Sequence, residues 1–137
     1  MAAAPQTIAS SWKVEEPPKA VFFDFGGTLD ADGITWKDRF YLLYLAEHVE
    51  VDRDRYDRAY YIADDALAAR RLSGCSFRET LLLQITGVLE ALNVADPGLA
   101  SRLCDRFLQD SLSKIRSNLR TLRELSARFR LGIISNF

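Results

Sequence analysis

Residues 20–30, AVFFDFGGTLD, decide the fold of this chain. The first four of them are all apolar, with β-branched and aromatic side chains, which is typical of a short strand buried on both faces of a parallel sheet. The apolar run stops at Asp24, and two glycines follow at residues 26 and 27. An acidic residue at the carboxyl end of such a strand points into the crevice where open α/β sheets bind ligands. We therefore predict a strand that ends in a ligand-binding loop.

The residue types of this loop suit anion chemistry. Glycines let the backbone approach a ligand closely and offer amide groups to an anion. A carboxylate beside them can ligate Mg²⁺ or act as a covalent nucleophile. An ordinary Asp-x-Gly-Gly turn explains the pattern equally well, so the residues alone leave a catalytic and a purely structural interpretation open.

A second strand is predicted near the other end of the sequence. Residues 131–134, LGII, repeat the short apolar pattern and are followed by Ser135. From about residue 35 to residue 130 the apolar positions recur at helical spacing instead, as in the stripe Phe77, Leu81, Ile85, Val88 and Leu92. The sequence therefore predicts a strand, four inserted helices, a last helix from about residue 118, and a strand.

Several helix ends are predicted by local signals. Residues 76–79, SFRE, fit a capping box. Asp96-Pro97 fits an N-cap followed by a first-turn proline, so a helix is expected to begin there. Gly74 and Asn93 stand where helices are expected to end.

These elements predict an α/β fold class, because two parallel strands need a crossover connection and the last helix supplies it. The expected divisions are a flexible N-terminal segment (1–18), the first strand and loop (19–33), an α-helical cap (34–116), and the crossover helix with the second strand (117–137). The chain ends three residues beyond a core strand, so we also expect it to be cut off within a domain.

The predicted sheet is too small to cover its own strands. Parallel sheets are normally covered on both faces, and one crossover helix covers only one. We expect apolar side chains such as Phe22 and Ile133 to be exposed, and the regions 19–30 and 131–137 to be aggregation-prone or partly unfolded.

Composition limits the classes of function. The chain has 137 residues, 48% of them hydrophobic, with 18 basic and 19 acidic side chains and a net charge of −1. This balance predicts one domain with a real core and favours neither nucleic acid nor an anionic membrane as a partner. No secretory signal stands at the N-terminus and two cysteines make no disulfide framework, so a cytoplasmic location is expected. The oligomeric state is left open.

Residues 21–30 resemble the first motif, hhhhDxDGTLxD, of the haloacid dehalogenase (HAD) superfamily. Residues 132–137, GIISNF, resemble the second motif of that family, a strand that ends in Ser or Thr and is often followed by Asn. The helical segment between them is similar to the cap found there in one large subgroup. The resemblance covers residues 19–137 and implies a HAD-like Rossmannoid core, here partial with two parallel strands, with an α-helical cap insertion.

The resemblance implies a role for each matching residue. Asp24 would be the nucleophile, forming an aspartyl-phosphate or, in dehalogenases, an alkyl ester. Mg²⁺ would be bound by the Asp24 carboxylate and the backbone carbonyl of Gly26. Ser135 would hydrogen-bond the transferring phosphoryl oxygen. Binding of the phosphate or substrate would fall to Gly27, Thr28 and Asn136.

The sequence departs from the family pattern in two ways. Phosphatases of the family carry a second Asp, a general acid and base, where this chain has Gly26, and losing such a group typically costs ~10²–10⁴-fold in rate. The Lys of the third motif and the acids of the fourth would lie beyond Phe137. Asp64-Asp65 is the one acidic pair resembling the fourth motif, but its mid-helix position favours a solvated face. One carboxylate and one carbonyl are poor for Mg²⁺ unless substrate and water complete the shell.

Two classes of function follow. The first is a HAD-like hydrolase that cleaves a phosphorylated small molecule with Mg²⁺, or performs dehalogenase- or phosphonatase-like chemistry because of Gly26. The second is a catalytically silent binding module or a non-functional truncated fragment. Among the other conspicuous side chains, Tyr56, Tyr60 and Tyr61 fit either a cap pocket or bundle packing, and His48 and Cys75 fit surface positions.

Overall fold

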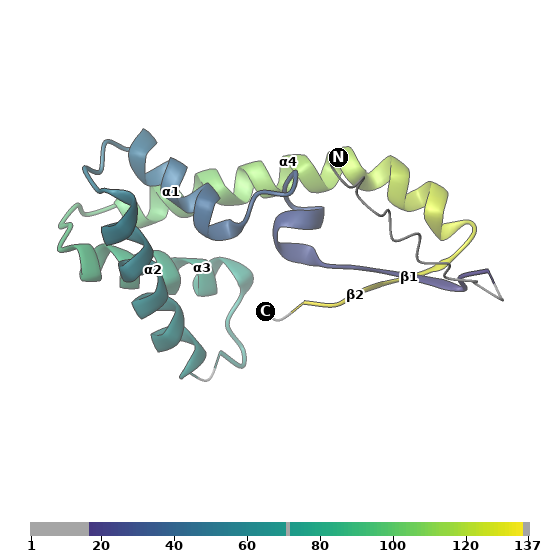
Figure 1. Cartoon of the computed structure of the whole chain (residues 1–137), viewed down its shortest axis with the longest axis horizontal. Helices are drawn as coiled ribbons and strands as arrows, with labels where there is room; N and C mark the ends of the chain where they lie inside the picture. The colour runs from purple at the N-terminus through teal and green to yellow at the C-terminus, as the bar shows by residue number, and fades with distance from the viewer. Residues whose placement is uncertain (1–16, 71, 136–137) are drawn as a thin grey trace, which may run out of the picture.

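The computed structural model describes residues 17–70 and 72–135. Its elements are, in chain order, β1 (Ala20–Phe23), η1 (Phe25–Leu29), α1 (Trp36–Ala46), α2 (Arg53–Ala68), α3 (Phe77–Leu92), α4 (Leu99–Ser126) and β2 (Arg130–Ile133). Figure 1 shows α1, α2 and α3 gathered at one end, the two strands at the other, and α4 running along both. The described chain is thus a mixed α/β structure that is mostly helical. The predictions for residues 1–16, Asn136 and Phe137 lie outside the described residues.

The two strands are neighbours and run parallel, as predicted. Phe22 pairs with Gly132, and Phe23 pairs with Ile133. The amide of Ile134 donates to the carbonyl of Phe23 at 2.9 Å, which extends the pairing one residue past the end of β2. The chain therefore leaves both strands at the same edge of the sheet, immediately before Asp24 and Ser135.

The strands are not buried on both faces, which corrects the pattern-based prediction of buried strands. Phe22 is 62% exposed, Ile133 60% and Ile134 65%. Phe22 pairs with Gly132 while Ile133 pairs with Phe23, so Phe22 and Ile133 point to opposite faces, and the described elements leave both faces partly uncovered. The ring of Phe22 lies across Gly132, where an added Cβ would stand 2.7 Å from two of its carbons. The expected exposure of apolar strand side chains is confirmed.

This exposure predicts a locally weak sheet. Leaving a large apolar side chain in water forfeits roughly 1.5–3 kcal/mol compared with burying it. We expect the amides of β1 and β2 to exchange with solvent faster than those of α2 and α3, and the protein to self-associate as its concentration rises. Hydrogen exchange read by mass spectrometry, with size-exclusion chromatography on the same sample, measures both effects. Slow exchange of both strands in a monomeric sample would contradict this expectation.

The hydrophobic core lies among the helices rather than at the sheet. Sixteen buried apolar side chains from α1 to α4 and the adjoining loops form one cluster. Two of them are tyrosines whose hydroxyls find backbone acceptors: Tyr44 donates to the carbonyl of Ile85 at 3.2 Å, and Tyr56 to that of Lys37 at 2.8 Å. Burial raises the pKa of both hydroxyls. Tyr56 therefore packs the bundle, one of the two alternatives left open for it.

The helix ends follow the predicted signals in part. The capping box of Ser76 and Glu79 is present, and Asn93 ends α3 in the left-handed conformation (φ 57°). His48, two residues beyond the end of α1, adopts the same conformation (φ 61°), with its side chain exposed. The prediction at Gly74 is wrong, because α2 ends at Ala68 and Gly74 lies in the loop that follows.

The predicted start and division of the last helices are also wrong. α4 begins at Leu99 after Gly98 (φ 99°), not after Asp96, whose carboxylate instead accepts from Arg102 at 2.9 Å. It then continues unbroken to Ser126, so no separate helix begins near residue 118. The reason is that residues 99–126 contain no Gly or Pro to interrupt the helix. One helix of about 42 Å, at 1.5 Å per residue, therefore serves both the cap and the crossover.

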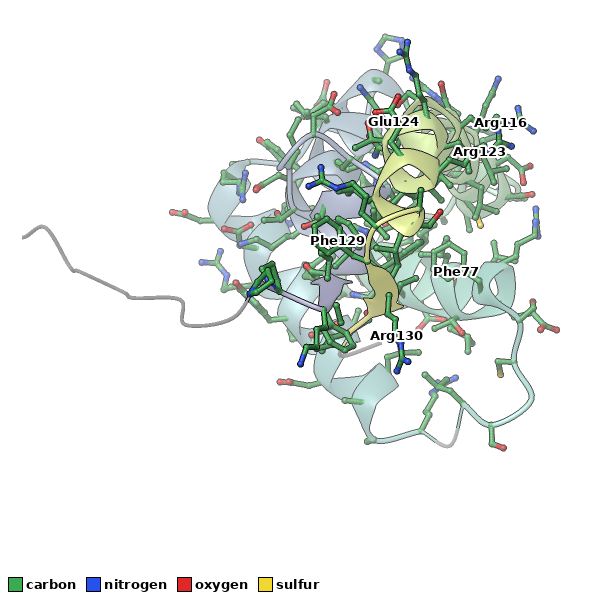
Figure 2. The ribbon with its side chains drawn as sticks, turned by 90° about the vertical axis from the view of Figure 1, so that its right-hand side faces the viewer. Phe77, Arg116, Arg123, Glu124, Phe129 and Arg130 are labelled. Atoms are coloured by element: carbon green, nitrogen blue, oxygen red, sulfur yellow. The ribbon has the colours of Figure 1, made fainter. Side chains whose placement is uncertain are left out.

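The far half of α4 carries an exposed basic face. Figure 2 shows Arg116 and Arg123 projecting from this helix, with Glu124 beside them. Arg120 also lies there, paired with Glu124 at 2.9 Å across one helical turn. These arginines form a solvated face and none of them lines the pocket described below.

Candidate functional site

The loop after β1 depends on glycine at position 27. Gly27 has φ 83°, and a Cβ there would stand 3.2 Å from the carbonyl oxygen of Ile34. Its amide donates to Asp30 Oδ1 at 2.8 Å, and its carbonyl accepts from the amide of Gly33 at 2.9 Å. These contacts close the wide turn η1, so the loop that follows Asp24 has a fixed shape.

Asp30 holds this loop against the helices. Its side chain is fully buried. Besides Gly27, its donors are Trp36 Nε1 at 2.8 Å, Arg39 Nη1 at 2.8 Å and Ser111 Oγ at 3.1 Å. The carboxylate is thus satisfied by four donors, one from its own loop, two from α1 and one from α4. Asp30 matches the last position of the first motif, but no sequence signal indicated this burial.

Arg39 completes the same network. Its Nη2 donates to Ser111 Oγ at 2.9 Å and to the carbonyl of Phe107 at 3.3 Å. Its guanidinium also stacks over the Phe107 ring, 4.0 Å from the centroid. The Arg39 side chain is only 10% exposed, so the Asp30–Arg39 pair is a desolvated ion pair, and both oxygens of its carboxylate have donors.

An aromatic cluster joins the loop to the cap. The Phe25 ring lies 6.3 Å from that of Trp36 and 6.1 Å from that of Phe77. Trp36 continues the contact to Phe107 at 5.5 Å, and Phe107 stacks on Phe40 at 4.2 Å. Edge-to-face and stacked pairs of this kind add to the stabilisation that burial gives. The residue directly after Asp24 is therefore anchored to α1, α3 and α4.

A pocket of about 620 Å³ lies between this loop and the helices. That volume is typical of a small-molecule site. Its loop side brings together the described residues to which the sequence assigned a site: Asp24, Gly26, Gly27, Thr28 and Ser135. Asn136 lies outside the described residues. The roles of these residues remain predictions, but their placement around one cavity is what the strand-end argument required.

The helical side of the pocket was not predicted in detail. It is lined by polar side chains from α1, α2 and α3, namely Lys37, Tyr60, Asp64, Thr80 and Gln84, and by apolar ones such as Phe40, Leu67 and Leu81. Burial, with the nearby negative charge of Asp64, raises the pKa of Tyr60 to about 12. Tyr60 thus lines a cap pocket, the other alternative left open for the tyrosines.

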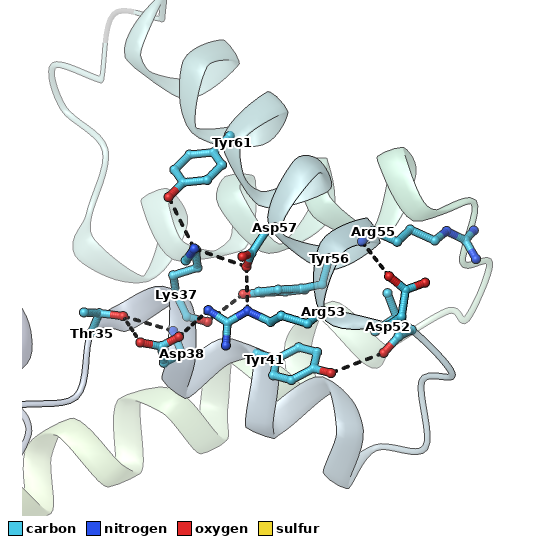
Figure 3. Close-up of polar contacts among 11 residues, drawn as sticks. Thr35, Lys37, Asp38, Tyr41, Asp52, Arg53, Arg55, Tyr56, Asp57 and Tyr61 are labelled. Carbon is cyan, nitrogen blue, oxygen red and sulfur yellow. Dashed lines mark hydrogen bonds and ion pairs between the residues drawn. The ribbon is translucent and has the colours of Figure 1, made fainter.

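Lys37 is the cation among the described residues of this pocket, and it already has partners. Figure 3 shows its amine between Asp57 and Tyr61, both on α2. The distances from Nζ are 3.2 Å to Asp57 Oδ1 and 3.3 Å to the Tyr61 hydroxyl. Burial lowers the pKa of Lys37, but the bonds to Tyr61 and Asp57 outweigh it and hold the pKa above its ordinary value.

The described residues do not by themselves fit a resident Mg²⁺. No group of three or more His, Cys, Asp or Glu side chains is arranged to hold a metal ion within residues 17–70 and 72–135. The donors named by the sequence, the Asp24 carboxylate and the Gly26 carbonyl, are oxygens of the right type but leave most of an octahedral shell unfilled. We therefore derive no chemical step through the ion.

Gly26 lies close against the indole of Trp36. A Cβ at position 26 would lie 3.3 Å from Trp36 Cε2 and Nε1, closer than most real contacts of this kind. The same Nε1 donates to Asp30, so the indole has little freedom to retreat. A side chain such as a second Asp at position 26 would therefore have to displace the Trp36 indole.

We expect Gly26→Asp to destabilise the protein by roughly 1–3 kcal/mol, the usual range for overpacking. The substituted side chain must push the indole away from Asp30, and Gly26→Ala should give a smaller effect of the same sign. Urea denaturation measures the stability. Tryptophan emission, recorded in a Trp12→Phe background so that only Trp36 contributes, measures the displacement. Unchanged emission together with unchanged stability would show that position 26 has room.

Comparisons with protein-family models, curated proteins and solved structures find no match to this chain. In addition, no helix within the described ranges is long and apolar enough to cross a membrane. The geometry of the pocket therefore carries the functional interpretation.

Proposed function

We propose that this chain is a HAD-like hydrolase that cleaves a phosphate monoester of a small molecule, with Asp24 as the nucleophile. The observation that carries the proposal is the meeting of two strand ends. Asp24 follows β1 and Ser135 follows β2 at one edge of a parallel pair, and both line a pocket with Gly27 and Thr28. This is the arrangement that the two motifs, taken together, would need for one phosphoryl group to contact both side chains.

The proposed reaction has two steps. An Asp24 carboxylate oxygen attacks phosphorus, and the bond from phosphorus to the ester oxygen breaks, releasing the alcohol, which takes a proton from water. Water then attacks the aspartyl-phosphate and releases inorganic phosphate and the free carboxylate. Phosphoryl transfer depends mainly on positioning and on stabilising charge on the phosphoryl oxygens. The Ser135 hydroxyl and the rigid loop held by Asp30 are suited to that task.

One observation favours a second reaction class. Position 26 has no carboxylate, and a Cβ there would lie 3.3 Å from the Trp36 indole, so a carboxylate side chain would have to displace that ring. Reactions in which the leaving group needs no proton, such as displacement of halide from a carbon, do not require that acid. Hydrolysis of a haloalkanoic acid through an alkyl ester on Asp24 is therefore the alternative activity.

The test is an activity screen of the purified chain. Release of inorganic phosphate from a panel of phosphate monoesters, and of halide from haloacids, is measured with and without added Mg²⁺. Saturable phosphate release supports the proposal, and saturable halide release in its place supports the alternative. No release from either panel, with the protein shown to be folded by circular dichroism, would favour the silent binding module.

A further inference from the structure

The helical wall of the pocket contains a buried acceptor without a donor. Gln84 is 6% exposed, and its Nε2 donates to the carbonyl of Tyr60 at 3.4 Å. Its Oε1 is buried and has no hydrogen-bond partner among the described residues. Exchanging the two amide atoms would not help, because an oxygen would then face the Tyr60 carbonyl. Such groups are rare in folded proteins, since they cost stability without a compensating bond.

The same wall carries a second acceptor. Asp64 lies one turn after Tyr60 on α2 and also lines the pocket, with its side chain exposed. Burial raises the pKa of the Tyr60 hydroxyl, and the negative charge of Asp64 adds to that shift. Lys37, the nearby amine, is already engaged by Asp57 and Tyr61. The wall formed by Gln84 and Asp64 therefore offers acceptors and negative charge to whatever enters.

The distance along α3 from Phe77 to Gln84 shows how far Gln84 lies from the loop after β1. Phe77 at the start of α3 contacts Phe25, which is next to Asp24. Gln84 is seven residues further on, which corresponds to about 10 Å along the helix axis. On α3 between these two residues, Thr80 and Leu81 line the pocket. Gln84 therefore lies about the length of a small molecule along α3 from the end of that helix that contacts the loop after β1.

We propose that Gln84 and Asp64 form a specificity subsite for a hydrogen-bond donor at the end of the substrate remote from the phosphate, an ammonium group being preferred to a hydroxyl. For the phosphate end the inference rests on the proposed function. The terminal torsion of a glutamine amide is broad. Because Gln84 lines the pocket, rotation about this torsion can present Oε1 to a donor in the cavity, in exchange for the long 3.4 Å bond from Nε2 to the Tyr60 carbonyl. The carboxylate of Asp64 supplies the preference for positive charge.

The test is a binding experiment with three matched probes. Pentyl phosphate, 5-hydroxypentyl phosphate and 5-aminopentyl phosphate share a phosphate and a chain length and differ only at the remote end. Isothermal calorimetry on the wild-type chain is expected to give affinities in the order amino, hydroxy, alkyl. Each step should be about tenfold, since a hydrogen bond to a buried or charged acceptor is of that size. Equal affinities for the three probes, or no binding of any of them, would overturn the proposal.

Two variants separate the two acceptors. Gln84→Met should remove the preference for hydroxy over alkyl and raise Tm, because the unpartnered oxygen is gone; a purely structural glutamine would lower Tm instead. Asp64→Asn should remove the preference for amino over hydroxy. The matched controls are Gln109→Met and Asp65→Asn, at exposed positions outside the pocket, which should leave all three affinities unchanged.

Binding and turnover are read separately, so the two proposals fail in different ways. If the probes bind in the expected order but none is hydrolysed, the proposed function is wrong and the subsite stands. If the probes are hydrolysed but Gln84→Met and Asp64→Asn leave the order of affinities unchanged, the proposed function stands and the subsite is wrong.

Discussion

Replacing Asp24 by asparagine is expected to abolish release of inorganic phosphate, lowering kcat by at least about 10⁴-fold, as removal of a covalent nucleophile does elsewhere. The neutral amide oxygen is a poor nucleophile and forms no acyl phosphate. The loss should not come from unfolding, because the Asp24 side chain is exposed and stands after β1 without a capping bond. Circular dichroism and the urea midpoint are therefore expected to stay at their wild-type values.

The matched control is Asp110→Asn, an exposed carboxylate on α4 that does not line the pocket. It makes the same chemical change and should leave turnover intact. Mass spectrometry of acid-quenched protein should locate a phosphoryl group on Asp24 in the wild type and none in Asp24→Asn. Retained turnover in that variant, or a phosphoryl group on another side chain, would remove Asp24 from the role of nucleophile.

The strand-end residues could be predicted because their signal is local. A short apolar run that stops at an acid or a serine is visible within ten residues, and parallel pairing then places both ends at one edge. β1 begins and ends where its apolar run does, and Asp24 and Ser135 line one pocket as a result. The resemblance in residues 21–30 added chemical roles to positions that the pattern had already singled out.

The rest of the site depends on contacts between distant residues. Asp30 is buried because Arg39 and Ser111 reach it, and Ser111 lies 81 positions away in the sequence. Gln84 stands beside an apolar stripe on α3, where a polar residue normally reaches the helix edge. Nothing in its spacing indicated that α2 would close over it. Burial of a polar side chain is a property of the packed helices, so no local pattern contains it.

The continuity of α4 is a further case of this kind. Sequence signals mark where helices begin and end, and residues 99–126 contain no signal that stops a helix. The spacing of the apolar residues nevertheless suggests two helices in this stretch, because helix boundaries are the least certain part of such a prediction. Here Phe107 packs in the helical core, and Asn118, three turns later, donates its side-chain amide to the carbonyl of Leu29 at 3.0 Å. One rigid helix therefore ties the cap to the loop after β1. A substitution that loosens that connection should therefore destabilise both the helical cap and the loop after β1.

Asp30→Ala is the substitution expected to loosen it most. Removing one partner of a buried ion pair leaves the other charge uncompensated, which typically lowers the free energy of unfolding by ~3–5 kcal/mol. Arg39 would remain buried against Phe107, while the amide of Gly27 and the indole of Trp36 would lose their acceptor. Urea denaturation followed by circular dichroism measures the change. The control is Asp32→Ala, whose exposed pair with Lys114 should be worth less than about 1 kcal/mol.

A double variant shows whether the loss comes from the stranded charge. Asp30→Leu combined with Arg39→Met replaces the ion pair by apolar side chains and should recover much of the stability that Asp30→Leu alone loses, because apolar replacements of buried pairs are often near neutral. Activity should not return with it, since a leucine side chain accepts no hydrogen bond and the Gly27 loop is then held by packing alone. If the double variant is no more stable than Asp30→Leu, the loss of stability comes instead from the missing hydrogen bonds of Gly27 and Trp36. The unpaired charge of Arg39 then contributes nothing to that loss.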